Sequence, residues 1–389
     1  MSSDPISPNP FCLSRRKFLG LSCTLALCWA GAERPARAQD LRKGYLQARP
    51  SPYFISLGQG KVQCTLCPRQ CQVSPGERGD CQVRENRGGT YYTLVYGNPC
   101  SVHVDPVEKK PFYHLLPTSR SFSIATAGCN LHCKFCQNWE ISQAAPENTF
   151  NFDLPPQRVA ALAEENGCAS VAHTYVEPTI FIEYMMDVGK YAKTKGILNV
   201  CHSNGYINPK PLNDLLKVLD AACIDLKGFE ESFYQEITGG TLEPVLATLQ
   251  TLAHKKVHLE IVNLIVPTKN DQPERIEEMC RWILQKLGPQ TPIHFSRFYP
   301  LYRLKNLPPT PVATLEKARQ TARKAGLEYV YIGNVPGHEG ESTYCPSCQK
   351  LLIKRVGYQI QEMSLKKGQC PKCGKKIYGL WEANKAGGV

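Results

Sequence analysis

Cys129, Cys133 and Cys136 are the residues of this 389-residue chain whose types and spacing most clearly predict chemistry. They are separated by three and two residues and follow an apolar, strand-like run at 122–127. Three thiolates on one loop can bind three irons of a cubane [4Fe–4S] cluster, and the fourth iron is then free to bind a small molecule. The alternative is a zinc loop with a distant fourth ligand, which would close the coordination shell of the metal. Phe135 and the preceding strand favour the cluster with an open position.

A second group of cysteines precedes this loop, with intervals of two, three and nine residues. Pro68, Gly76 and Gly79 shape the turns between them. Four thiolates could close a tetrahedral zinc site or hold an auxiliary iron–sulfur cluster, and disulfides are a third alternative. The sequence alone leaves the metal of this group open. The four residues are Cys64, Cys67, Cys71 and Cys81.

A third group lies near the C-terminus as two Cys-x-x-Cys knuckles joined by a hairpin-like segment at 351–365. This arrangement predicts a closed zinc ribbon. Its ligands are Cys345, Cys348, Cys370 and Cys373. The chain contains 19 cysteines, and these short spacings suit metals better than long-range disulfides. The sequence therefore predicts a metalloprotein.

The segment between the cysteine groups alternates short apolar strands with amphipathic helices, which is the pattern of βα units in a parallel sheet. Strands are expected at 122–127, 170–175, 198–203, 222–226, 258–266, 293–298 and 328–332. Helices are expected at 156–166, 180–194, 209–218, 243–254, 273–285 and 311–325. Six or so units predict an α/β fold, a partial and open (β/α)6 TIM-like barrel, with a small N-terminal four-cysteine module and a C-terminal zinc ribbon.

Polar residues follow several of these strands at the point where each strand ends. Glu177 follows the second strand, Ser203 and Asn204 end the third, and Asp225 and Lys227 close the fourth. Ligands of parallel barrels collect at the carboxyl ends of the strands, so we expect these side chains on one face with the cysteine loop. Simpler interpretations are a helix-initiating turn at Glu177 and a buried ion pair between Asp225 and Lys227.

Two further catalytic candidates, His294 and Arg297, belong to a later strand. They are weaker candidates, because a lone histidine on a strand is more often a core residue with its hydrogen bonds satisfied than a catalytic group.

Three longer strings in the sequence carry a resemblance to a known family. With the CxxxCx(aromatic)C loop they resemble the radical S-adenosylmethionine (SAM) superfamily, in the branch related to pyruvate formate-lyase activating enzymes. Within that branch the chain is similar to the radical SAM member of the AmmeMemoRadiSam system. The strings are Thr126-Ala-Gly-Cys-Asn130, Cys136-Gln-Asn-Trp139 and Thr174-Tyr-Val-Glu-Pro-Thr179.

The resemblance implies a [4Fe–4S] cluster on the cysteine loop, SAM chelated at the open iron, and an electron donor. Reductive cleavage of SAM would give a 5′-deoxyadenosyl radical. The resemblance places Glu177 at the SAM amino group, Ser203 and Asn204 at the ribose, and Asp225 and Lys227 near both SAM and substrate.

His202 stands where the activating enzymes often have an acidic residue, which puts a bound monovalent cation in doubt. The resemblance also implies a protein substrate, with AMMECR-like and Memo-like proteins as partners.

Residues 1–38 are expected to be a twin-arginine signal peptide, because Arg15 and Arg16 precede an apolar stretch and Ala36-Arg37-Ala38 offers a cleavage site. The twin-arginine route exports folded, cofactor-bearing proteins, which predicts an exported or periplasmic protein. A cytoplasmic location is the alternative, because SAM is made there. The other predicted parts are a linker at 39–57, the four-cysteine module at 58–120, the barrel at 121–339, and the ribbon with its tail at 340–389.

The leading hypothesis is a radical SAM enzyme that abstracts hydrogen from a protein. One alternative is a radical SAM enzyme that modifies RNA, because the ribbon is rich in lysine and the net charge is +12. Solvated lysines around a small fold explain the same composition. The other alternative is a non-catalytic, exported iron–sulfur and zinc protein that transfers electrons, because export would separate the protein from SAM.

Overall fold

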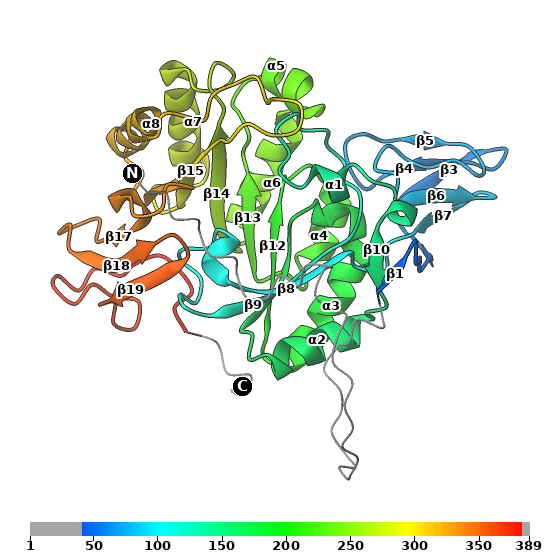
Figure 1. The fold of residues 1–389 in the computed structure, drawn as a ribbon, viewed down its shortest axis with the longest axis horizontal. Coiled ribbons are helices and arrows are strands. Elements are labelled where there is room, and N and C mark those ends of the chain that lie inside the picture. The colour runs from blue at the N-terminus through cyan, green and yellow to red at the C-terminus, as the bar shows by residue number, and fades with distance from the viewer. Residues whose placement is uncertain (1–40, 383–389) are drawn as a thin grey trace, which may run out of the picture. The chain divides into compact units, whose positions relative to one another are not determined.

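Eight strands form the central sheet of the protein, whose computed structural model describes residues 41–382. The strands from β9 onward run parallel to one another, and β8 joins the edge antiparallel to β9. In sheet order they are β16 (Val330–Gly333), β15 (Ile293–Arg297), β14 (His258–Ile265), β13 (Ala221–Asp225), β12 (Leu198–Ser203), β11 (Ser170–His173), β9 (Arg120–Ala125) and β8 (Ser101–Pro106). The sheet crosses the middle of Figure 1. Within the described residues its two edge strands do not pair with each other, so the barrel is open.

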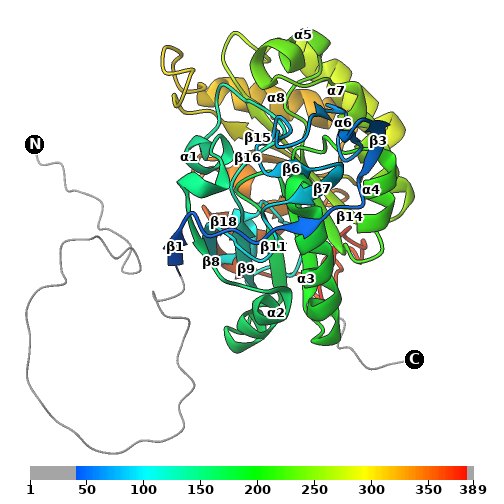
Figure 2. The same cartoon turned by 90° about the vertical axis from the view of Figure 1, so that its right-hand side faces the viewer.

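Six crossover helices connect the parallel strands. They are α2 (Pro156–Glu165), α3 (Ile182–Thr194), α4 (Pro209–Leu215), α6 (Glu243–His254), α7 (Pro273–Lys286) and α8 (Val312–Ala325). Proline occupies the first turn of four of them, where its fixed φ suits the helix and its missing N–H costs no hydrogen bond. Helix α7 buries Ile276, Met279, Cys280 and Ile283, a spacing that puts them on one face. Figure 2 shows α3, α4 and α6 together on one side of the sheet.

This arrangement confirms the α/β fold that the sequence predicts. The parallel strands are buried on both faces, which is why each appears in the sequence as a nearly continuous apolar run. The sequence interpretation did not anticipate strand β8, nor the short elements α1 (Trp139–Ser142), α5 (Glu231–Phe233) and the π-helical turn η5 (Tyr234–Thr238). These short elements lie in the connections around the cysteine loop and the fourth strand.

The N-terminal module consists of two small antiparallel sheets. One contains β2 (Arg49–Pro50), β7 (Thr90–Thr93) and β6 (Arg84–Arg87), and the other contains β3 (Phe54–Gly58), β4 (Lys61–Cys64) and β5 (Gln72–Val73). A further strand, β1 (Leu41–Lys43), pairs with β10 (Phe150–Phe152). Residues within the predicted linker at 39–57 thus contribute strands to sheets, because their backbone pairs with the later strands β10, β7 and β4.

The C-terminal ribbon is a three-stranded antiparallel sheet of β17 (Thr343–Tyr344), β18 (Leu351–Val356) and β19 (Gln359–Met363). It is joined to the barrel by hydrogen bonds to the segment before β9. The Arg355 guanidinium donates to the Tyr113 carbonyl at 2.8 Å, and the Leu380 amide donates to the His114 carbonyl at 2.8 Å. The ribbon therefore forms one wall beside the sheet.

The described residues all belong to one compact unit, which spans Gln39–Val389. The predicted signal peptide at 1–38 lies outside the described residues. Across residues 41–382, none of the helices combines the length and the apolar character needed to cross a bilayer.

Candidate active site

The cysteine loop follows β9 and lies at the carboxyl ends of the parallel strands. Gly128 begins the loop with a φ of +90°, a conformation that suits glycine. The loop is fixed to the other side of the barrel by backbone hydrogen bonds, from the His132 amide to the Thr238 carbonyl at 2.8 Å and from the Lys134 amide to the Ile237 carbonyl at 2.9 Å. The unanticipated turn η5 is therefore one of the supports of the loop.

All three thiols of this loop line one cavity of about 820 Å³. Burial raises the pKa of the Cys133 thiol to about 11, while the nearby Lys227 ammonium opposes that rise. Burial, and then the Glu177 carboxylate, raise the pKa of Cys129 well above its usual value. Thiols with such pKa values lose their protons when a metal binds them. The lining contains no fourth cysteine among the described residues, so this donor set fits a [4Fe–4S] cluster with one open iron.

Glu177 lies at the end of β11, where its carboxylate receives three hydrogen bonds. The donors are the Thr179 amide at 2.9 Å, the Ser203 hydroxyl at 2.7 Å and the Asn204 amide at 2.7 Å. Burial raises the pKa of Glu177, and these hydrogen bonds oppose the rise. The Asn204 side chain donates to the Asn130 side chain at 2.8 Å. Ser203 and Asn204 thus hold Glu177 and the cysteine loop in place, a role that the sequence interpretation had not assigned to them.

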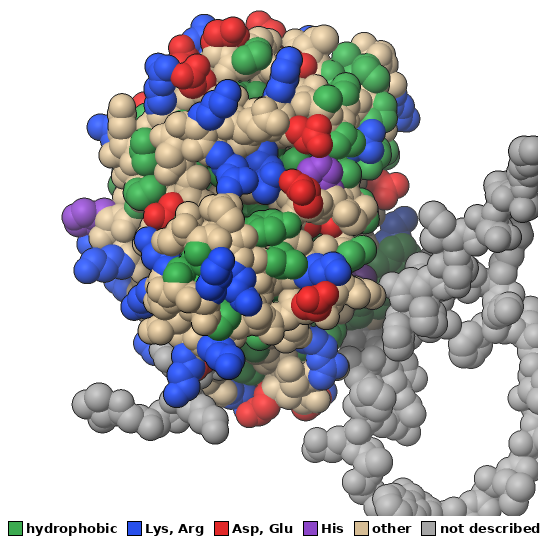
Figure 3. Space-filling view, turned by 90° about the vertical axis from the view of Figure 1, so that its left-hand side faces the viewer, with side chains coloured by type: hydrophobic (Ala, Val, Ile, Leu, Met, Phe, Trp, Pro, Cys, Tyr) green, Lys and Arg blue, Asp and Glu red, His purple; other side chains and the backbone are tan. Residues whose placement is uncertain are grey.

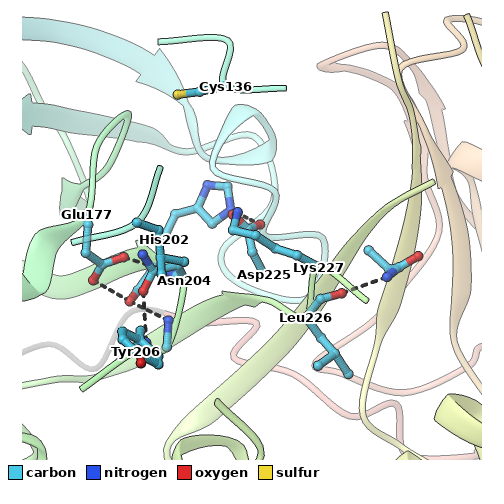
Figure 4. A network of polar contacts seen from close by, with 12 residues as sticks. Cys136, Glu177, His202, Asn204, Tyr206, Asp225, Leu226 and Lys227 are labelled. Carbon is cyan, nitrogen blue, oxygen red and sulfur yellow. Dashed lines mark hydrogen bonds and ion pairs between the residues drawn. The ribbon is translucent and has the colours of Figure 1, made fainter. Parts of the chain in front are cut away.

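Asp225 bridges the side chains of His202 and Lys227 at the end of β13. Its carboxylate accepts from His202 Nε2 at 2.7 Å and from Lys227 Nζ at 2.8 Å, as Figure 4 shows. Burial disfavours the charged form of Asp225, but His202 and Lys227 outweigh it and lower its pKa. Burial likewise opposes the charge of Lys227, yet Asp225 and the Cys133 thiol raise its pKa. An ammonium group is therefore held beside the thiol at the centre of the loop.

Two side chains, one from β14 and one from the loop that follows it, hold the backbone of Leu226 and Lys227 in place. The Asn263 side chain donates to the Leu226 carbonyl at 2.7 Å, and the Asn270 side chain donates to the Lys227 carbonyl at 2.7 Å. These two amides keep Asp225 and Lys227 directed toward the cavity.

The two weaker candidates are placed differently. His294 lines the cavity, and its Nε2 is 2.8 Å from Glu260 Oε2. Glu260 is fully buried and also accepts from the Tyr113 and His114 amides. The structure does not bring Arg297 into the cavity lining, because its guanidinium donates to the Thr310 carbonyl at 2.8 Å. The signal for Glu260, which the sequence interpretation missed, is a lone acidic residue inside an apolar strand.

A second missed residue is Tyr175, which precedes Glu177 by two positions and lines the same cavity. It has a φ of +66°, which is strained for a tyrosine. Its hydroxyl donates to Asp105, and Lys110 Nζ lies 3.0 Å from the same hydroxyl. The Asn138 side chain, from the end of the cysteine loop, donates to the Tyr175 carbonyl at 2.7 Å. Tyr175 thus joins the second strand to the cysteine loop.

The other end of the cavity is formed by the ribbon and by residues near it. Tyr358, at the turn between β18 and β19, and Tyr299 are both close to half exposed there. The buried carboxyl groups of Glu108 and Glu341 also belong to this end. The cavity therefore extends from the cysteine loop to the ribbon.

The ribbon cysteines form a compact set of ligands. Their four sulfurs lie within 4.8 Å of one another, with Cys345 and Cys373 at 3.5 Å and Cys348 and Cys370 at 3.6 Å. Four sulfurs that converge in this way are consistent with the predicted zinc ribbon. The N-terminal cysteines Cys64, Cys67, Cys71 and Cys81 also lie near one another, since each of the three with a shifted pKa is affected by other thiols of the group.

Charges on the ribbon face are mixed. Lys354 pairs with Glu362 at 3.2 Å, and Lys375 pairs with Glu328 at 3.6 Å. Figure 3 shows lysine and arginine side chains on this face with acidic side chains among them.

A parallel α/β barrel with a three-thiol loop and polar side chains at the carboxyl ends of its strands defines a metalloenzyme whose metal centre keeps an open position. Residues 123–283 match the model of the Radical SAM superfamily. The uncharacterized protein MJ0808 of Methanocaldococcus jannaschii is 43% identical over 331 residues, which are 85% of this chain and 98% of that protein. The chain belongs to the radical SAM superfamily.

Two more distant likenesses are also found. The pyruvate formate-lyase 1-activating enzyme of Escherichia coli K12 is 23% identical over 224 residues, which are 52% of this chain and 89% of that enzyme. A radical SAM methyltransferase from Sphaerobacter thermophilus superimposes with a TM-score of 0.44 and 11% identity, over 76% of this chain and 80% of that one.

Proposed function

We propose that this radical SAM enzyme abstracts a hydrogen atom from a protein substrate, in the manner of an activating enzyme. The observation that supports the proposal is the shared cavity, which the three loop thiols line together with Glu177, Asp225 and Lys227 and which continues to the ribbon.

Cys129, Cys133 and Cys136 would hold the [4Fe–4S] cluster, and Glu177 would border SAM. When bound, these two groups together supply a 5′-deoxyadenosyl radical. Glu177 is prepared to receive an ammonium group, because three donors already fix its carboxylate in one orientation. Lys227 places a positive charge beside the Cys133 thiolate and so stabilises its charged form.

The first experiment measures 5′-deoxyadenosine released from SAM by the anaerobically reconstituted protein with dithionite as the reductant. We expect replacement of the three loop cysteines by alanine to abolish the product, while Cys168→Ala, a buried cysteine outside the site, retains it. Undiminished product from the triple variant would contradict the assignment of the loop.

Glu177→Gln separates SAM binding from cluster binding. The variant should keep its iron, because Glu177 is not a metal ligand in this assignment. Loss of a hydrogen bond to a charged group costs about 1.5–3 kcal/mol, so the dissociation constant of SAM should rise roughly 10- to 100-fold. An unchanged dissociation constant would remove Glu177 from the SAM site.

Three observations support a protein substrate. The cavity opens beside Tyr299 and Tyr358, two aromatic side chains of the kind enriched at protein interfaces. The ribbon face carries mixed charge, which suits a protein better than a phosphate backbone. Relatives at 22–23% identity are named pyruvate formate-lyase-activating enzymes.

Candidate substrates are AMMECR-like and Memo-like proteins, which are the partners that the family resemblance implies. A true substrate should increase 5′-deoxyadenosine formation and show an organic radical by electron paramagnetic resonance or a mass change. Tyr358→Ala should raise the substrate concentration needed for half of that increase. If these proteins have no effect and structured RNA does, the substrate class is wrong.

A further inference from the structure

The four cysteines of the N-terminal module surround a buried site with two unpaired donors. The Tyr91 hydroxyl and Arg84 Nε are both buried, and within residues 41–382 neither has a hydrogen-bond partner. Both residues border the cysteine segment, because the Tyr91 hydroxyl and Cys71 Sγ lie on the same side of Gly79, and the Gly79 amide donates to the Arg84 carbonyl at 2.9 Å. Buried donors without acceptors are costly, so an anionic group between the thiols would satisfy them.

The backbone at Gly79 and Asp80 lies close to the Tyr91 hydroxyl and to Cys71 Sγ. Gly79 allows the Tyr91 hydroxyl to approach, since a Cβ at this position would be 2.7 Å from that oxygen and 3.7 Å from Cys71 Sγ. The Asp80 amide lies 3.5 Å from Cys71 Sγ, in position to donate a hydrogen bond to the sulfur. Hydrogen bonds to sulfur are among the features that tune iron–sulfur clusters.

The spacing of the sulfurs distinguishes a cluster from a single ion. Ligands of one zinc ion converge at about 2.3 Å from a common point, as the ribbon sulfurs are placed to do. Of the described residues, only the ribbon cysteines form a set of three or more ligands within 4.8 Å of one another, so the module sulfurs are more widely spaced. Wider spacing is expected when each thiolate binds a different iron. The first three module cysteines also have the intervals of two and three residues found in cubane loops.

The module contacts the cysteine loop of the active site directly. An added Cβ at Gly128 would be only 2.6 Å from the Cys81 carbonyl oxygen, so a module ligand is in backbone contact with the residue before Cys129. Asp80, the neighbour of Cys81, lies 2.8 Å from His132 Nε2. On the other side Cys71 and Cys81 are partly exposed, while Cys64 and Cys67 are buried. The module thus lies between solvent and the loop.

We propose that Cys64, Cys67, Cys71 and Cys81 bind a second iron–sulfur cluster, which passes single electrons to the cluster on the active-site loop. In each transfer the module cluster is oxidised by one electron and the loop cluster is reduced by one. A one-electron carrier protein of the flavodoxin or ferredoxin class then reduces the module cluster again. The transfer step rests on the proposed function, whereas binding of the second cluster does not.

Metal analysis of the whole, anaerobically purified protein tests the binding. Two cubane clusters and one ribbon zinc predict roughly eight irons and one zinc per chain. Replacement of Cys129, Cys133 and Cys136 by alanine should leave roughly four irons in the module. About four irons with two zincs in the unmodified protein, or loss of all iron from the triple variant, would overturn the second cluster. Failure of the proposed function has a different signature, because the triple variant would then keep all of its iron.

Tyr91→Phe tests the site with a change that removes only one oxygen. Loss of a hydrogen bond to the cluster should lower the midpoint potential of one cluster and leave the other unchanged. Tyr92→Phe is the matched control, because the neighbouring Tyr92 is partly exposed and stacks with Arg87 instead. Identical potentials in the unmodified protein and in both variants would remove Tyr91 from the site.

Electron paramagnetic resonance of the fully reduced protein tests the transfer step. The four-cysteine module and the active-site loop touch each other, so two paramagnetic clusters bound to them should broaden each other's signals. The broadening should disappear in the variant with Cys129, Cys133 and Cys136 replaced by alanine. A simple sum of two unbroadened signals would refute electron transfer between them.

Discussion

Gly128→Ala should destabilise the protein strongly, because the four-cysteine module packs closely against the active-site loop at Gly128. Its φ of +90° lies in the region that L-residues avoid. A Cβ would also be 2.6 Å from the Cys81 carbonyl oxygen and 2.6 Å from a methyl group of Val83. The carbonyl is backbone, so it can yield only if the module moves away from the loop.

The magnitude has two parts. The left-handed conformation costs an alanine about 1–2 kcal/mol, and overpacking of a tight site adds about 1–3 kcal/mol. We therefore expect a loss of about 2–5 kcal/mol in the free energy of unfolding. Gly76→Ala isolates the first part, because Gly76 has a φ of +83° and no heavy atom within 4 Å of its added Cβ. That control should lose only about 1–2 kcal/mol.

Urea unfolding followed by circular dichroism compares the two variants with the unmodified protein, and iron analysis of the same samples reports on the loop. Gly128→Ala should show the lower midpoint and the lower iron content. If Gly128→Ala is no less stable than Gly76→Ala and keeps its iron, the contact between module and loop does not support the site, and the reasoning is refuted.

Three more outcomes are expected. Glu183→Gln leaves the buried Arg84 without its carboxylate partner at 2.6 Å, and should lower the free energy of unfolding by about 3–5 kcal/mol in urea titrations; a loss below about 1 kcal/mol would contradict this. Burial lowers the pKa of His173 to about 4, so the unfolded chain binds more protons between about pH 6.5 and 4, and stability is lost as the pH falls through that window. When the pH is lowered from 7 to 5, the free energy of unfolding of His173→Gln should therefore fall by about 2 kcal/mol less than that of the unmodified protein. Equal decreases in the two proteins would contradict this. Asp225→Asn removes the negative charge that pairs with Lys227, so SAM cleavage should fall while iron content stays constant, and full activity would make Asp225 a structural residue only.

The sheet was predictable because parallel strands are buried on both faces. A strand such as β13 has to be apolar along its length, and this requirement is visible in Ala221–Asp225 without any knowledge of its neighbours. Strand β8 escaped prediction because it lies at the edge, and its His103 and Asp105 interrupt the apolar pattern. The same reason hides Arg49–Pro50 and Phe54–Gly58, whose strands are short and mostly exposed.

The site residues were predictable where they follow a strand directly. Glu177 and Asp225 are polar residues that come just after apolar runs, and the topology of parallel strands brings them to one face. Ser203 and Asn204 also line the cavity, but their hydrogen bonds to Glu177 were not predictable from the sequence. Only the structure shows that both donate to Glu177. Glu260 was hidden because its partners Tyr113, His114 and His294 come from two distant segments of the chain.

The sequence by itself determined the functional groups and the secondary structure of this protein. These are three groups of thiols, an alternation of strands and helices, and acidic residues at the ends of strands. These are local properties, since ligand spacing and burial periodicity are written over a few adjacent positions. The tertiary structure alone decided that the module of Cys81 touches the loop of Cys129, and that the ribbon lines the far end of the cavity. Contacts between residues so distant in the chain depend on how whole elements pack, and no short stretch of sequence contains that information.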